Sequence, residues 1–132
     1  MLLTQYRRSV ILFLLIAFFV PAVHADKLAS IIIDDLGNNL EYGNMAIALP
    51  GPITLAFLPH TVFSEELADK AHSSGKEIML HLPLQSVRHH SHTPGTLKLH
   101  MTHNEFIRQL ESDIESVPHI KAVSYTHLTL PT

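Results

Sequence analysis

The sequence contains no cysteine and no tryptophan, and only 16% of its 132 residues are charged. Without cysteine the chain has no disulfide framework, no thiolate zinc site and no cysteine nucleophile, so any catalysis relies on oxygen and imidazole groups. Five glycines and eight prolines are too few for a collagen-like chain or a chain dominated by linkers. Because 46% of the residues are hydrophobic, the chain is also too apolar to be disordered. The length and composition fit one globular domain.

Basic residues are also scarce, with 9 Lys and Arg against 12 Asp and Glu. The chain therefore lacks the basic surface that nucleic-acid binding requires, and we expect no nucleic-acid partner. Histidine is abundant, with 11 copies whose charge depends on pH.

The first 25 residues have the character of a secretory signal peptide. Two arginines precede an unbroken apolar run over residues 10–20, and Val23 and Ala25 supply the small residues of a cleavage site. The run is shorter than the roughly 20 residues of a membrane-spanning helix. We expect cleavage after Ala25, a periplasmic or secreted location, and no stable membrane span in the mature chain. An uncleaved membrane anchor remains the alternative.

After the signal peptide, patterns typical of strands and helices alternate. Apolar runs predict strands over 28–33, 53–58 and 77–82 and a fourth beginning over 120–123, and helical patterns predict helices from Asn38 or Asn39 to 49, over 65–74 and from 102 to 117. The first strand is expected to be buried on both faces. Ser64 is expected to cap the second helix, with Gly75 just past its end, and Thr102 and Glu105 to form a capping box. Phe106, Leu110, Ile114 and Val117 predict the apolar face of the third helix.

This alternation predicts an α/β fold of parallel βαβ units with right-handed crossovers. Functional sites in such folds gather at the carboxyl ends of the strands. A long loop over residues 83–101, rich in His, Ser, Pro and Gly, is more typical of a functional loop than of a simple connection.

Three chemically active residues lie at strand ends on this same edge. Asp34 and Asp35 end the first predicted strand, and His81 lies near the end of the third. Adjacent carboxylates repel each other, and a divalent metal relieves that repulsion. One Asp and His81 would then be metal ligands, and the other Asp would deprotonate water. The alternative is a structural part for these residues, in which the Asp pair caps a turn and His81 forms hydrogen bonds within the surrounding strands.

Several segments together resemble the exported divergent polysaccharide deacetylases. The resemblance rests on Ile31–Gly37, Leu58–Pro59, Ala71–Pro83 and Pro94–Leu97, which read IIIDDLG, LP, AHSSGKEIMLHLP and PGTL. It implies a partial (β/α) barrel of the polysaccharide deacetylase type over residues 26–123. It also implies metal-dependent hydrolysis of acetyl groups on a cell-envelope glycan, with zinc as the expected ion.

The resemblance also implies roles for individual residues. Asp34 would be the catalytic base, and Asp35 and His81 would be metal ligands. His60 follows the second strand on the same edge, so we expect it to contact substrate. His89, His90 and His92 form a short His-rich tract, which makes metal storage a further reading.

The chain departs from the family pattern at two places. The parent superfamily has a second His four residues after the first, and here that position is Gln85. Residues 124–132 replace a family segment similar to Asn-Asn-His-Met-Gly, and we expect them to be a non-native tail on a truncated, inactive chain. The alternative function is therefore a noncatalytic periplasmic protein that binds a glycan or a partner.

Overall fold

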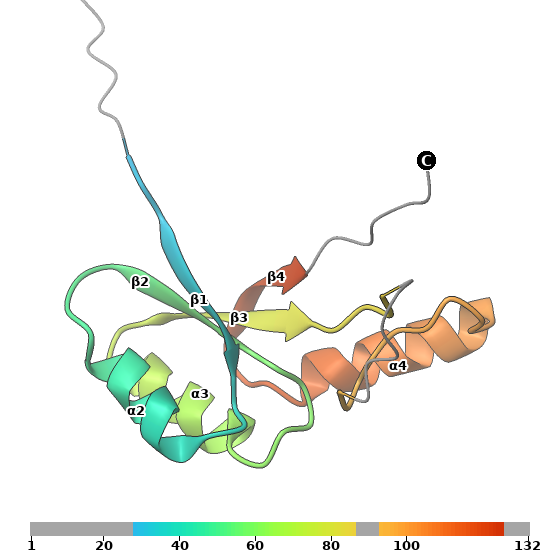
Figure 1. The fold of residues 1–132 in the computed structure, drawn as a ribbon, viewed down its shortest axis with the longest axis horizontal. Coiled ribbons are helices and arrows are strands. Elements are labelled where there is room, and N and C mark those ends of the chain that lie inside the picture. The colour runs from blue at the N-terminus through green and yellow to red at the C-terminus, as the bar shows by residue number, and fades with distance from the viewer. Residues whose placement is uncertain (1–27, 87–92, 126–132) are drawn as a thin grey trace, which may run out of the picture.

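The computed structural model describes residues 28–86 and 93–125. Strands and helices alternate along these residues (Figure 1): β1 (Ile31–Leu36), α2 (Leu40–Ala48), β2 (Ile53–Phe57), α3 (Ser64–Ser73), β3 (Glu77–Leu82), α4 (His103–Glu115) and β4 (Ile120–Tyr125). The four strands form one parallel sheet in the order β1-β2-β3-β4. The predicted α/β fold of parallel βαβ units is confirmed.

The helices pack against one face of the sheet (Figure 1). Alternate strand residues point to that face, because successive side chains of a strand point to opposite sides. The fully buried side chains of this layer include Leu55, Phe57, Leu67, Ile78 and Leu80. His81 lies between Leu80 and Leu82, which both belong to this core, and so its side chain points to the other face.

The first strand is more exposed than the sequence predicts. It begins at Ile31 rather than at Leu28, and it continues through both Asp residues. Ile31 and Ile32 are 58% and 44% exposed, so the expectation of burial on both faces is wrong. The physical reason is position, since β1 is an edge strand with only β2 beside it.

The start of α3 also differs from the prediction. Phe63 is the N-cap residue and makes no side-chain cap, while Ser64 is already helical and buried. The Ser64 hydroxyl donates to the Leu58 carbonyl at 2.5 Å, and so it stabilises the preceding loop rather than the helix end. At the other end the prediction is confirmed, because Gly75 adopts φ 77° and its N–H donates to the His72 carbonyl at 2.9 Å.

Helix α4 begins as predicted but buries a different residue. Thr102 and Glu105 form the expected capping box. Phe106 and Ile114 are more than one third exposed, whereas the one buried residue within the helix is Asp113. The predicted apolar face is therefore only partly confirmed.

Strand β4 extends to Tyr125, so Ser124 and Tyr125, the first two residues of the predicted non-native tail, belong to the sheet. That the tail is non-native stays a prediction. Ser124 and Tyr125 pair with His81 and Leu82 of β3. Three segments lie outside the described residues: the expected signal peptide, the His-rich tract at 89–92 and residues 126–132. Within the described ranges, no helix is long and apolar enough to cross a membrane.

Candidate functional site

The structure brings together the three residues that the sequence singles out. His81 Nδ1 lies 3.3 Å from Asp34 Oδ1, and His81 Nε2 lies 3.3 Å from Asp35 Oδ1. His81 is 5% exposed, whereas the two Asp side chains are 45% and 75% exposed. A buried imidazole thus lies between two carboxylates that remain open to solvent.

A local irregularity of β1 aims the two carboxylates. Between Ile33 and Leu36 the pairing of β1 with β2 shifts, so that β1 contains one residue more than its partner. Asp35 adopts φ 61°, a left-handed conformation that Asp and Asn tolerate better than most residues. Because of this bulge, adjacent Asp side chains both reach His81 instead of pointing to opposite faces of the sheet.

Ser124 of β4 completes the hydrogen-bond chain. Its hydroxyl donates to Asp34 Oδ1 at 3.0 Å and lies 2.8 Å from His81 Nδ1. Because the Ser124 proton points to Asp34, the chain is satisfied when His81 Nδ1 carries a proton and donates it to Ser124. This tautomer leaves a lone pair on His81 Nε2.

That lone pair faces an oxygen of Asp35 only 3.3 Å away. Two acceptors at this distance repel each other unless a proton or a cation lies between them. Two ligands of one tetrahedral zinc ion, each at about 2.0–2.1 Å from the metal, are themselves separated by about 3.4 Å. His81 and Asp35 therefore fit two positions of a metal site. Within residues 28–86 and 93–125, no group of three or more His, Asp or Glu side chains forms a metal site.

Gln85 occupies the position where the parent superfamily has its second His, and here it makes structural hydrogen bonds. Its side-chain oxygen accepts a hydrogen bond from the Leu99 N–H at 3.1 Å, and its backbone N–H donates to the Leu97 carbonyl at 2.9 Å. Gln85 thus ties the loop before α4 to the end of β3.

The structure places His60 against α4. Its Nε2 lies 3.0 Å from Asp113 Oδ1, and its backbone N–H donates to Ser116 Oγ at 3.3 Å. Among the described residues, its hydrogen bonds do not include Asp34, Asp35 or His81. Its loop is nonetheless joined to the end of β1, because the Leu58 N–H donates to the Leu36 carbonyl at 2.9 Å. His60 therefore lies near the carboxyl ends of the strands, as Asp34, Asp35 and His81 do, but it belongs to a separate group of hydrogen bonds.

Asp113 is a buried acid that the sequence reading missed. Its side chain is 0% exposed, and Oδ1 accepts hydrogen bonds from Gln109 and His60. Its Oδ2 atom is buried without a hydrogen-bond partner among the described residues. Burial raises the pKa of the carboxyl, and the hydrogen bonds from Gln109 and His60 oppose part of that rise.

Comparison with known proteins identifies a family and relatives that match most of the chain. Residues 31–127 match the divergent polysaccharide deacetylase family. The chain is 34% identical over 119 residues to uncharacterized protein YibQ of Escherichia coli K12, covering 90% of this chain and 37% of YibQ. It is 29% identical over 86 residues to an uncharacterized protein of Haemophilus influenzae, covering 65% of this chain and 31% of that protein.

A solved structure has the same fold. Uncharacterized protein ATU2773 of Agrobacterium tumefaciens C58 superposes with a TM-score of 0.69 at 22% sequence identity, covering 75% of this chain and 42% of ATU2773. The chain thus spans less than half the length of each of these relatives. The matched residues include β1 with its Asp pair and β3 with its histidine. The chain belongs to the divergent polysaccharide deacetylase family.

Proposed function

We propose that the protein is an exported, metal-dependent deacetylase that removes acetyl groups from a cell-envelope carbohydrate. The observation that carries this proposal is the approach of His81 Nε2 and Asp35 Oδ1 to 3.3 Å, with Asp34 beside the same imidazole. The family to which the chain belongs supports a glycan as the substrate class.

Asp35 and His81 are the residues that would hold the metal, with zinc as the expected ion. When bound, the metal would polarise the acetyl carbonyl and stabilise negative charge on its oxygen. Ser124 and Asp34 keep the proton of His81 on Nδ1, so that Nε2 stays available as a ligand.

Asp34 is the proposed general base. It is 45% exposed, so a water molecule and the substrate can reach it. Asp34 accepts a proton from the attacking water as the water oxygen bonds to the acetyl carbon. As the bond between that carbon and the leaving nitrogen or oxygen breaks, the leaving atom takes the electron pair and receives the proton from Asp34. His60 is proposed to contact the glycan at the same edge.

This chain spans less than half the length of its relatives and is expected to be inactive alone, so the test uses a longer wild-type protein that contains residues 26–123. It measures acetate release from acetylated glycans by that purified protein, before and after removal of metal with a chelator. We expect release with zinc restored and none in its absence. N-acetylated and O-acetylated glycans are assayed separately, because the site chemistry suits both.

A noncatalytic glycan-binding or partner-binding protein is the second candidate. It is favoured by the structural part that Gln85 plays and by the lack of a third metal ligand among the described residues. This candidate predicts glycan binding without acetate release under any divalent ion.

The metal-storage hypothesis predicts instead that deleting residues 89–92 removes all metal affinity.

A further inference from the structure

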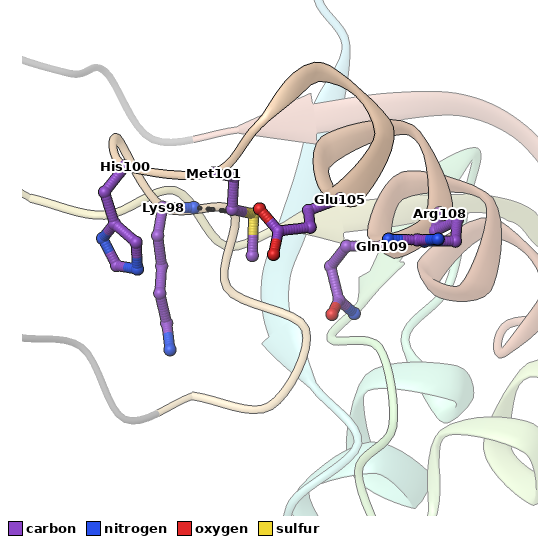
Figure 2. A pocket seen from close by; sticks show the side chains of 6 residues that line it. All are labelled: Lys98, His100, Met101, Glu105, Arg108 and Gln109. Carbon is purple, nitrogen blue, oxygen red and sulfur yellow. Dashed lines mark hydrogen bonds between the residues drawn. The ribbon is translucent and has the colours of Figure 1, made fainter.

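A cavity of about 360 Å³ lies where the loop after β3 leads into α4. Figure 2 shows its lining, with Lys98 and His100 on the loop and Glu105, Arg108 and Gln109 on the helix. Met101 is the remaining lining residue. All six belong to the described part of the chain.

The charges of this cavity are not balanced. Lys98 and Arg108 are both basic, and Glu105 is the one acid among the lining residues. The Glu105 carboxylate is already committed to the helix cap, because it accepts from both the N–H and the hydroxyl of Thr102 at 2.8 Å. The side chains of Lys98 and Arg108 form no hydrogen bond or ion pair with other described residues. Arg108 lies close enough to Glu105 to help lower the pKa of its carboxyl, and the Lys98 side chain lies at the other end of the lining and extends away from Arg108 (Figure 2). The two cations therefore line different parts of the cavity, and each can face a different anionic group of an extended ligand.

The side-chain amide of Gln109 already forms a hydrogen bond within the protein. Gln109 Nε2 donates to the buried Asp113 Oδ1 at 2.9 Å. Cations rather than amide donors thus determine which ligand the cavity favours. An oxyanion meets that requirement, since charge-assisted hydrogen bonds from Lys and Arg are the strong ones.

An apolar hollow of about 320 Å³ adjoins the cavity and shares Lys98 and Met101 with it. Its other lining residues include Leu84, Leu97, Leu99 and Phe106. An apolar surface with a partly exposed aromatic ring suits the carbon face of a sugar. Together the two hollows could hold a sugar ring and its charged substituent.

The cavity lies beyond the end of the strand that contains His81. The Leu97 N–H donates to the Pro83 carbonyl at 2.9 Å, and Pro83 follows His81 by two residues. The segment over residues 97–101 is thereby fixed to an extension of β3. The cavity therefore lies on the segment that follows the strand of His81.

We propose that the cavity lined by Lys98 and Arg108 is a binding subsite for the anionic groups, carboxylates or phosphates, of a sugar polymer. This inference rests on the proposed function for the identity of the polymer. It narrows the substrate class from acetylated glycans in general to acidic ones. The attraction depends on charge and is weakened by salt.

The experiment measures binding by calorimetry to three probes: an oligosaccharide of galacturonate, a neutral oligosaccharide of N-acetylglucosamine of the same length, and a sugar phosphate. The test variants are Lys98→Gln and Arg108→Gln, alone and together. Lys121→Gln is the matched control, because Lys121 is an exposed cation on β4 whose loss changes the net charge equally. All variants are checked by circular dichroism.

We expect an acidic probe to bind more tightly than the neutral one, and each test variant to weaken that binding by about threefold to tenfold. Lys121→Gln should leave it unchanged. Preference for the galacturonate or for the sugar phosphate assigns the anion. Equal binding of acidic and neutral probes, or equal losses in Lys98→Gln and Lys121→Gln, would overturn the proposal. The binding measurement does not depend on acetate release, so failure of the deacetylase proposal and failure of this subsite proposal can be distinguished.

Discussion

His81 Nε2 of β3 lies 3.3 Å from Asp35 Oδ1 of β1, although β2 separates the two strands in the sheet. Neighbouring strands are about 4.8 Å apart, so the backbones of β1 and β3 are about twice that distance from each other. The bulge in β1 turns the Asp35 side chain so that it meets His81 across β2. The site thus depends on side chains from two strands that are not neighbours in the sheet.

Removing one ligand should weaken metal binding without unfolding the protein. Asp35→Asn keeps the size of the side chain, and Asn tolerates the left-handed φ of 61° at this position. Loss of partners outside the ligand shell typically costs about 10- to 100-fold in affinity, so loss of a ligand should cost at least about 100-fold. The measurement is zinc titration by calorimetry.

His119→Asn is the control for that titration, because Asn tolerates the left-handed φ of 64° at this position. His119 is an exposed imidazole paired with Asp69 at 2.9 Å and stacked on His72, and it takes no part in the Asp34–Asp35–His81 group. We expect its zinc affinity to equal that of the wild type. Unchanged affinity in Asp35→Asn would show that the pair does not hold the metal.

The buried carboxyl of Asp113 should make stability depend on pH. Burial raises its pKa above the ordinary value of 3.8 in the folded state. The folded state therefore binds this proton more tightly than the unfolded state. The resulting stabilisation is fully present below about pH 3.8 and is lost as the pH rises through the folded pKa.

Urea unfolding at a series of pH values checks this expectation. The free energy of unfolding of the wild type, minus that of Asp113→Asn, should fall as the pH rises above 3.8 and then level off. Glu111→Gln, an exposed change on the same helix, should run parallel to the wild type. A difference between wild type and Asp113→Asn that stays constant or grows with pH would contradict the assigned direction.

Most of the fold follows from sequence patterns. The bounds of β3 and the capping box at Thr102 agree with the prediction, because strand runs and cap residues act locally. The exposure of β1 and the part played by Ser64 were not predictable in this way. Both depend on which neighbours the chain places beside these residues, and local patterns do not contain that information.

The candidate site was predicted in part. The rule that sites gather at the carboxyl ends of parallel strands points to Asp34, Asp35 and His81 from the sequence alone. The bulge in β1 and the contact with Ser124 are not predictable from the sequence, because the bulge depends on how β1 pairs with β2 and the contact depends on how β4 pairs with β3. Asp113 was missed because helical spacing assigned the inner face to apolar residues, whereas the burial of Asp113 depends on a distant histidine.

Close packing of α2 on α3 predicts a destabilising substitution. A Cβ atom at Gly43 would lie 2.3 Å from Leu67 Cδ1, and Leu67 is fully buried. Gly43→Ala should therefore lower the free energy of unfolding by about 1–3 kcal/mol, despite the higher helix propensity of alanine. Glu41→Ala, an exposed change on the same helix, should alter it by less than about 0.5 kcal/mol. A Gly43→Ala protein as stable as the wild type in urea would show that the two helices are less tightly packed.

The most direct test of the central claim compares acetate release and zinc binding in the wild type and in Asp34→Asn. Asp34 is proposed to move a proton, and its loss should reduce acetate release from an acetylated glycan by about 10²- to 10⁴-fold. Zinc should still bind, because Asp35 and His81 remain. Acetate release by Asp34→Asn at the wild-type rate, or no release by the wild type with zinc bound, would contradict the assignment of this site as a deacetylase centre.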